Sequence, residues 1–149
     1  ADTFPTTTDP EYAIIVLVNG AADRLLIMLV NDAGTMKWKL IFYDGSQYQS
    51  QLFTDPTPQT DTWYCIEVKW EKNSSSGAQL WIDGVDKGSF GTTANDDISQ
   101  VCVGQKRLSD YPDFYIDSVV VADTYIGPIS GVSIPVLMHN YNLMNNRRV

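Results

Sequence analysis

Histidine and cysteine are scarce in this chain of 149 residues. His139 is the single histidine, and Cys65 and Cys102 are the only cysteines. A zinc site needs several Cys or His ligands at short spacing, and a disulfide scaffold needs several cysteine pairs. Catalysis by Ser-His-Asp or Cys-His groups also needs a histidine near the nucleophile, whereas His139 lies in the C-terminal tail. The composition therefore predicts none of these three classes of protein.

Basic residues and long apolar runs are also lacking. Ten Lys and Arg residues stand against 18 Asp and Glu residues, which gives a net charge of −8. Duplex nucleic acid and anionic membranes both attract basic surfaces, so neither is a predicted partner. No apolar run approaches the roughly 20 residues that cross a bilayer, and residues 1–10 lack the basic start and apolar core of a signal peptide. We expect an acidic protein that is extracellular or lies on a cell or virion surface, with residues 1–10 as a leader or linker.

What the chain does contain is a series of short alternating segments, of which residues 62–84 are the clearest. Ile66, Val68 and Trp70 alternate with polar residues, and Leu80 and Ile82 continue the apolar pattern. A period of two with one apolar face indicates half-buried strands. The turn formers at 73–77 predict that the second strand begins only after them, and the Asp-Gly pair at 83–84 predicts a tight turn at its end.

Further strands are predicted at 11–19, 24–31, 36–43, 47–53, 87–90, 98–104 and 114–122. Many short strands with almost no helical periodicity are typical of a β-sandwich or jelly roll. On these strands the alternation assigns Trp38 and Trp70 to the core face, while Trp63 fits either a packing or a binding role. The sequence thus predicts one all-β domain over residues 11–128.

The tail at 129–149 has a different character. Leu137, Tyr141 and Met144 fall on one helical face, and Arg147 and Arg148 suit the C-terminal end of a helix. One interpretation is a short helix packed on its own domain. The other is an arm that reaches a neighbouring chain or begins another domain.

Several motifs occur in an order that resembles a known superfamily. Trp63 opens the strand that carries Ile66, Val68 and Trp70, and the run at 80–84 reads Leu-Trp-Ile-Asp-Gly. The later runs are Val-Cys-Val-Gly at 101–104, Tyr-Ile-Asp-Ser-Val-Val-Val at 115–121 and Tyr-Ile-Gly-Pro at 125–128. Together they resemble the concanavalin A-like lectin and glucanase superfamily, in particular its laminin G-like branch. The resemblance implies an antiparallel two-sheet jelly-roll sandwich with a concave groove, although such domains usually begin with one or two strands more than precede Glu11 here.

The catalytic pattern of that superfamily is missing. Its glucanases carry two spaced carboxylates in a Glu-x-Asp-x-x-Glu strand, and Glu11, Glu67 and Glu71 do not have that spacing. Its polysaccharide lyases use a Gln-x-His element, which is also absent. We therefore predict a non-catalytic protein.

Sugar binding remains a predicted activity, because aromatic rings contact the apolar face of a pyranose while amides and carboxylates bind its hydroxyl groups. Such groups occur on the non-core face of the predicted strands, and would line one groove if those strands are adjacent. The candidate ligand-binding residues are Lys39, Tyr43, Glu67, Gln79, Trp81 and Gln100. The alternative interpretation is a solvated sheet face, or one that a loop covers.

A structural calcium ion is a further expectation from the resemblance, which implies that Asp117 faces the ion. Calcium prefers oxygen ligands from carboxylates and loop carbonyls. Other acidic residues in nearby loops are Asp96, Asp97, Asp110 and Asp113. The alternative is ordinary surface acidity, because no Asp-x-Asp-x-Asp loop is present. Cys65 and Cys102 fit either a cross-strand disulfide or two free thiols.

Two functions follow as hypotheses. The first is a non-catalytic, lectin-like module that binds a carbohydrate or a surface partner. The second is a structural or adhesion subunit, such as a viral decoration or fibre protein, that contacts neighbouring protein subunits or forms a homo-oligomer through the tail at 129–149.

Overall fold

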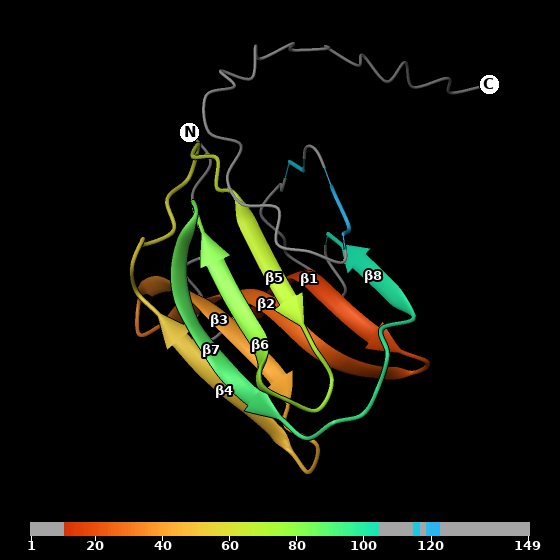
Figure 1. The fold of residues 1–149 in the computed structure, drawn as a ribbon. Helices are drawn as coiled ribbons and strands as arrows, with labels where there is room; N and C mark the ends of the chain where they lie inside the picture. Colours follow the sequence, from red (N-terminus) through yellow and green to blue (C-terminus); the bar gives the residue numbers. More distant parts are fainter. Residues whose placement is uncertain (1–10, 105–114, 117–118, 123–149) are drawn as a thin grey trace, which may run out of the picture.

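The computed structural model describes residues 11–104, 115–116 and 119–122, and within them the protein is all-β (Figure 1). Eight strands are present in this part of the chain, in the order β1 (Glu11–Asn19), β2 (Ala22–Asp32), β3 (Thr35–Tyr43), β4 (Tyr48–Phe53), β5 (Ile66–Trp70), β6 (Ser74–Ile82), β7 (Val85–Thr92) and β8 (Gln100–Val103). Within these described residues there is no helix of the length and apolar character needed to cross a membrane.

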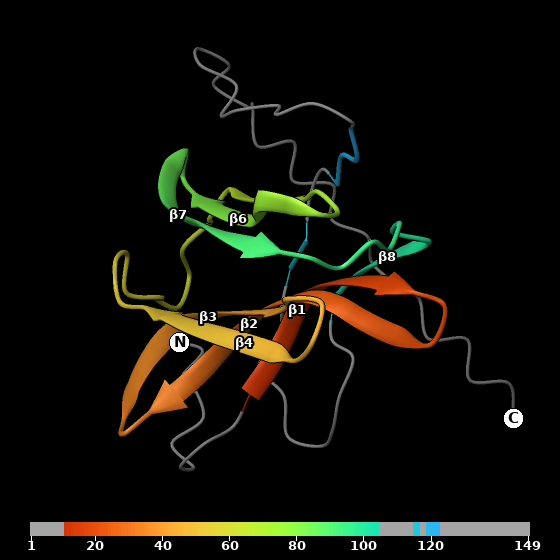
Figure 2. The ribbon, with the colours of Figure 1, turned by 60° about the horizontal axis from the view of Figure 1, so that its bottom comes forward.

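The strands form two antiparallel sheets that pack as two layers (Figures 1 and 2). The five-stranded sheet has the order β4-β3-β2-β1-β8, and the three-stranded sheet has the order β5-β6-β7. Strands β1 to β4 follow one another as a meander, β5 to β7 form the second layer, and β8 returns to pair with β1. The predicted antiparallel two-sheet architecture is confirmed at this level.

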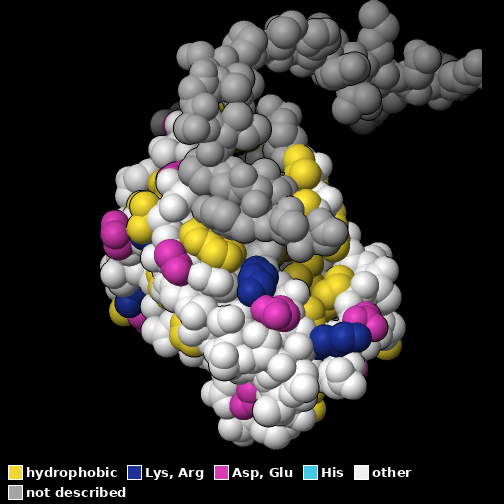
Figure 3. Space-filling view, in the orientation of Figure 1, with side chains coloured by type: hydrophobic (Ala, Val, Ile, Leu, Met, Phe, Trp, Pro, Cys, Tyr) yellow, Lys and Arg dark blue, Asp and Glu magenta, His cyan; other side chains and the backbone are white. Residues whose placement is uncertain are grey.

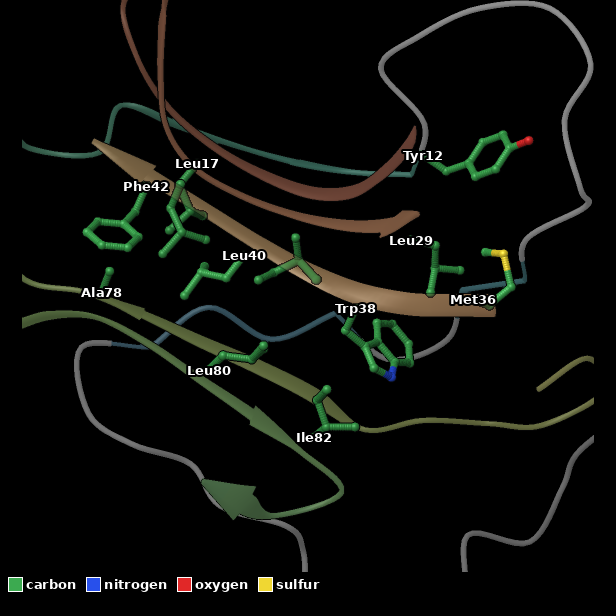
Figure 4. Packing of buried hydrophobic residues seen from close by; sticks show 12 residues of the cluster. Tyr12, Leu17, Leu29, Met36, Trp38, Leu40, Phe42, Ala78, Leu80 and Ile82 are labelled. Atoms are coloured by element: carbon green, nitrogen blue, oxygen red, sulfur yellow. The ribbon is translucent and has the colours of Figure 1, made fainter. Parts of the chain in front are cut away.

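The main core lies between the two sheets. Leu25, Ile27 and Leu40 of the five-stranded sheet and Leu80 and Ile82 of the three-stranded sheet are fully buried, and they belong to one apolar cluster. Figure 4 shows side chains from both layers pointing into this interlayer space. Burying one such side chain contributes about 1.5–3 kcal/mol, so the alternating apolar residues account for the pairing of the two layers.

Two hairpins contain tight turns that the sequence signals correctly. Asp83 and Gly84 have φ values of 52° and 75°, and Ala33 and Gly34 have φ values of 51° and 86°. Two successive residues with positive φ match the twist of the flanking strands, which is why Asp-Gly and similar pairs are favoured there. The tight turn predicted at 83–84 is therefore confirmed.

The prediction that residues 73–77 form a turn before the next strand is wrong. Strand β6 already begins at Ser74, because the chain reverses within Glu71 to Asn73, where Asn73 has a φ of 51°. Ser74 pairs with Thr92 of β7 rather than with β5. The polar residues of this segment therefore extend the three-stranded sheet along its β7 side, and their turn-forming composition is outweighed by that pairing.

Other predicted strands differ in length from the observed ones. The strand expected at 87–90 is longer and covers Val85–Thr92, whereas that expected at 98–104 is shorter and covers Gln100–Val103. Residues 115–116 and 119–122 are exposed and carry no strand, which contradicts the strand predicted over 114–122 for these residues. An alternating pattern forms a strand only where a neighbouring backbone accepts its hydrogen bonds. The tail at 129–149 lies outside the described residues.

The five-stranded sheet is apolar on its outer face too, which is the face directed away from the three-stranded sheet. Val16, Val18 and Val30 are at most 5% exposed there, and they cluster with Ala13 and Met28. Strands β1 and β2 are thus buried on both faces, as their nearly continuous apolar sequences require.

Candidate functional site

The six predicted ligand-binding residues are divided between opposite faces of the sandwich. Glu67, Gln79 and Trp81 lie on the outer face of the three-stranded sheet, because they alternate with core residues of β5 and β6. The other three lie on the outer face of the five-stranded sheet, and they are Lys39, Tyr43 and Gln100. The strands of the first group belong to one sheet and those of the second group to the other sheet, so the structure does not join the six residues into one groove.

The first group stays together around Trp81, and we call it the Trp81 face. Glu67 of β5 is the direct cross-strand partner of Trp81, and Asp86 of β7 is its partner on the other side. The Gln79 side chain donates its Nε2 hydrogen to Asp86 Oδ2 at 2.9 Å, and Asp86 Oδ1 accepts the Gly88 amide at 2.7 Å. The Trp81 indole thus has the Glu67 carboxylate on one side and the Asp86 carboxylate on the other, and Asp86 is hydrogen-bonded to the Gln79 amide.

Figure 3 looks onto the side where the three-stranded sheet lies in front. Backbone atoms and side chains that are neither hydrophobic nor charged predominate there, with small apolar patches and scattered charged groups. One of the charged pairs on the three-stranded sheet is Lys69 with Glu71, whose Nζ and Oε2 atoms are 2.6 Å apart. Hydrogen bonds from Lys69 and Ser74, together with the Lys69 charge, hold the pKa of the Glu71 carboxyl below its usual value.

The second group is engaged in packing within its own sheet. The Tyr43 ring lies 4.9 Å from the Arg24 guanidinium and 5.4 Å from the Tyr48 ring, and the Tyr43 hydroxyl donates to Gly45 O at 3.0 Å. Lys39 Nζ lies 2.5 Å from Glu11 Oε1. Because these side chains are held by neighbours beside a buried apolar centre, this face is a weaker candidate for a ligand.

Asp96, considered above as a calcium ligand, holds a loop to the sandwich instead. Its Oδ2 lies 2.8 Å from Arg24 Nε, and its Oδ1 accepts a hydrogen bond from Asn19 Nδ2 at 3.1 Å. Its backbone carbonyl accepts the indole hydrogen of Trp70 at 3.0 Å. Sequence reasoning missed this cluster, because Asn19, Arg24, Trp70 and Asp96 are far apart in the chain.

The described residues contain no group of three His, Cys, Asp or Glu side chains that could hold a metal ion. Asp97 pairs with Lys72, with Oδ1 and Nζ 2.6 Å apart. Asp110, Asp113 and Asp117 lie outside the described residues, so structural calcium at Asp117 stays a prediction.

Cys65 and Cys102 are both free thiols, which decides between the two alternatives that the sequence leaves open. Cys65 precedes β5, whereas Cys102 lies in β8 of the other sheet. Partial burial, and then the negative charges of Glu67 and Asp83, raise the pKa of the Cys65 thiol.

This raised pKa predicts slow alkylation of Cys65 despite its exposure. The thiolate is the nucleophile, and a higher pKa leaves a smaller thiolate fraction at any given pH below it. In a Cys102→Ser background, the rate of iodoacetamide modification should reach half its maximum at a higher pH in the folded protein than in the same protein unfolded in urea. Mass spectrometry measures both rates. A folded-state midpoint at or below the unfolded one would contradict the prediction.

An open cleft of about 470 Å³ lies at the side of the sandwich where β4 and β7 are edge strands. We call it the β4–β7 cleft. Its walls include Phe42, Asp44, Gln49, Gln51, Ser89 and Phe90. No role for this cleft was predicted from the sequence, although Gln49 and Gln51 occupy alternate positions of the strand predicted at 47–53.

No protein-family model, curated protein or solved structure matches this chain significantly. Its function has therefore to be inferred from its own side chains.

Proposed function

We propose that this protein is a non-catalytic, lectin-like module of concanavalin A-like jelly-roll type, and that it binds carbohydrate on the Trp81 face. The observation that carries the proposal is the cross-strand arrangement of Trp81 between Glu67 and Asp86, with Gln79 bonded to Asp86. The confirmed two-sheet architecture is consistent with this type of domain.

The chemistry of these side chains matches that of a sugar ring. The C–H groups on one side of a pyranose pack against an aromatic face, and its hydroxyl groups hydrogen-bond to carboxylates and amides at the ring edge. Antiparallel pairing brings directly opposite side chains to about 4.5–5.5 Å at Cβ. Glu67 and Asp86 therefore stand where hydroxyl groups of a sugar on Trp81 would lie.

The module is proposed to be non-catalytic because the Trp81 face lacks a complete acid–base constellation. Glycoside hydrolysis uses two carboxyl groups that flank the scissile bond from opposite sides of a cleft. Here Glu67 and Asp86 instead flank an indole on one sheet face. Binding without cleavage is the activity that these groups support.

The test is a glycan array followed by titration of any glycan that binds. Trp81→Ala should weaken binding by roughly tenfold or more, which corresponds to about 1.4 kcal/mol, because it removes the aromatic contact. Tyr43→Ala is the matched control, since it removes an aromatic ring from the opposite face of the sandwich. Circular dichroism checks that both variants fold.

Two outcomes would reject the Trp81 face. In the first, no glycan binds. In the second, Trp81→Ala binds as tightly as the unaltered protein, or Tyr43→Ala loses binding to the same extent. The second function, a structural or adhesion subunit that contacts protein subunits through residues 129–149, gains no support from the described residues and stays a hypothesis. The extracellular, cell-surface or virion location likewise stays a prediction.

A further inference from the structure

The two sheets differ in width, and this difference creates the β4–β7 cleft. Phe42 of β3 stacks on Phe90 of β7, with ring centroids 5.3 Å apart and an angle of 26° between the rings. The edge strand of the three-stranded sheet therefore lies over β3, and β4 extends beyond it. Figures 1 and 2 show β4 and β7 on the same side of the sandwich. The inner side of β4 is left open.

The side chains on this inner side of β4 are polar. Gln49 is paired with Phe42 and Gln51 with Leu40, and directly opposite residues in antiparallel strands point to the same face. Phe42 and Leu40 belong to the core, so both glutamines point into the interlayer space. Gln51 is nevertheless exposed. Apolar residues are expected at such positions when a second sheet covers them, and amides here fit an open, water-filled site.

Asp44 fixes one of these amides and closes one end of the cleft. Its Oδ2 accepts the Nε2 hydrogen of Gln49 at 2.7 Å, and its Oδ1 accepts hydrogen bonds from the Ser46 and Gln47 amides, each at 2.8 Å. The Gln47 amide, the Gln49 side chain and Ser46 hold the pKa of the Asp44 carboxyl well below its usual value. Gln49 is thereby oriented with its Oε1 as an acceptor.

Both carboxylate oxygens of Asp44 thus accept hydrogen bonds from this turn and from Gln49. The cleft also presents the two glutamine amides and the half-buried ring of Phe90. This lining offers hydrogen bonds and an aromatic surface, and its one charged side chain is the hydrogen-bonded carboxylate of Asp44.

We propose that the β4–β7 cleft is a second ligand site, and that it binds a neutral saccharide. A neutral ligand fits better than an anionic one, because the one charged side chain in the lining is the Asp44 carboxylate, whose oxygens already accept hydrogen bonds. Hydroxyl groups match the donors and acceptors of Gln49 and Gln51, and the C–H face of a pyranose matches the ring of Phe90. A volume of about 470 Å³ falls within the range of about 300–1,000 Å³ that is usual for small-molecule sites.

The site is separate from the Trp81 face and does not depend on it. NMR titration of the isotope-labelled protein with cellobiose, maltose and lactose distinguishes the two. We expect at least one of these sugars to shift the side-chain amide signals of Gln49 and Gln51 and the backbone signals of Ser89 and Phe90. Glucuronic acid serves as the charged comparison and should shift them less.

A pair of matched variants then tests the contribution of the amides. Gln51→Ala should weaken the binding of the sugar that shifts these signals. The expected loss of affinity is about two- to tenfold, the range expected for one hydrogen-bonding side chain. Gln59→Ala makes the same chemical change at an exposed glutamine outside both proposed sites and should leave the affinity of the cleft unchanged. Because Gln51 is exposed, its replacement is not expected to unfold the protein.

The proposal is overturned if none of the three sugars shifts the Gln49 and Gln51 signals, if glucuronic acid shifts them more than they do, or if Gln51→Ala leaves the affinity unchanged. If only the proposal for the Trp81 face is wrong, the experiments give a different result. In that case the cleft signals shift and respond to Gln51→Ala, whereas Trp81→Ala has no effect on any glycan.

Discussion

Replacing Trp38 with alanine is expected to destabilise the protein by about 3–5 kcal/mol. Trp38 is 2% exposed at the centre of the core. Its ring meets Tyr64 edge-on, with centroids 5.1 Å apart, and its Nε1 hydrogen is donated to Pro56 O at 2.9 Å. The substitution removes a large buried side chain, leaves a cavity and frees the connection between β4 and β5 from the core.

Urea unfolding followed by circular dichroism measures this loss. Trp63→Ala is the matched control, because Trp63 is 67% exposed and precedes β5. Surface substitutions usually change stability by less than about 0.5 kcal/mol. Equal losses for the two variants would show that Trp38 does not carry the core contact described above.

The second large effect is expected for Gly45→Ala, at about 3–4 kcal/mol. Gly45 has a φ of 108°, and a Cβ atom there would lie 2.1 Å from Thr93 Oγ1 and 2.8 Å from Ala94 N. The Asp44 carbonyl accepts the Thr93 amide at 2.7 Å. The turn between β3 and β4 is thus packed directly against the backbone that follows β7, and a methyl group would force the two apart.

Gly34→Ala is the matched control for this effect. Gly34 also has a positive φ, of 86°, but a Cβ atom there would have nothing within 4 Å. It should therefore show only the conformational cost of a left-handed alanine, about 1–2 kcal/mol. The difference between the two variants in urea unfolding isolates the contact between the turn and residues 93–94. Equal losses would mean that the turn relaxes without cost.

The contact at Gly45 also links the stability of the protein to ligand binding at the proposed second site. The same turn carries Asp44, which orients Gln49 at the end of the β4–β7 cleft. Loss of the packing at Gly45 is therefore expected to disturb ligand binding there even when the rest of the sandwich is folded. Trp81 and Asp86 lie at the opposite end of the β6–β7 pair from Thr92, which is next to the turn contact, so a smaller effect is expected on the Trp81 face.

For the strands with a clear alternation, the local pattern of the sequence was sufficient to predict which side is buried. In β3, β5 and β6 the alternation assigned Trp38, Trp70 and Leu80 to the core side, and all three pack there. This succeeds because the pleat of a strand turns successive side chains to opposite faces, whatever lies next to the strand. Tight turns were predictable for a similar reason, since residues with positive φ need Gly or small polar side chains.

Only the tertiary structure decided which strands are neighbours. Alternation shows that Tyr43 and Trp81 both point away from the core, but not that β3 and β6 belong to different sheets. The predicted ligand residues consequently separate onto two faces, and Trp81 remains with Glu67 and Gln79. The unequal width of the sheets, which exposes the inner side of β4 beside Phe90, is also a property of the assembled layers. Pairing partners and layer overlap depend on contacts between residues distant in sequence, and a period of two within one strand carries no information about them.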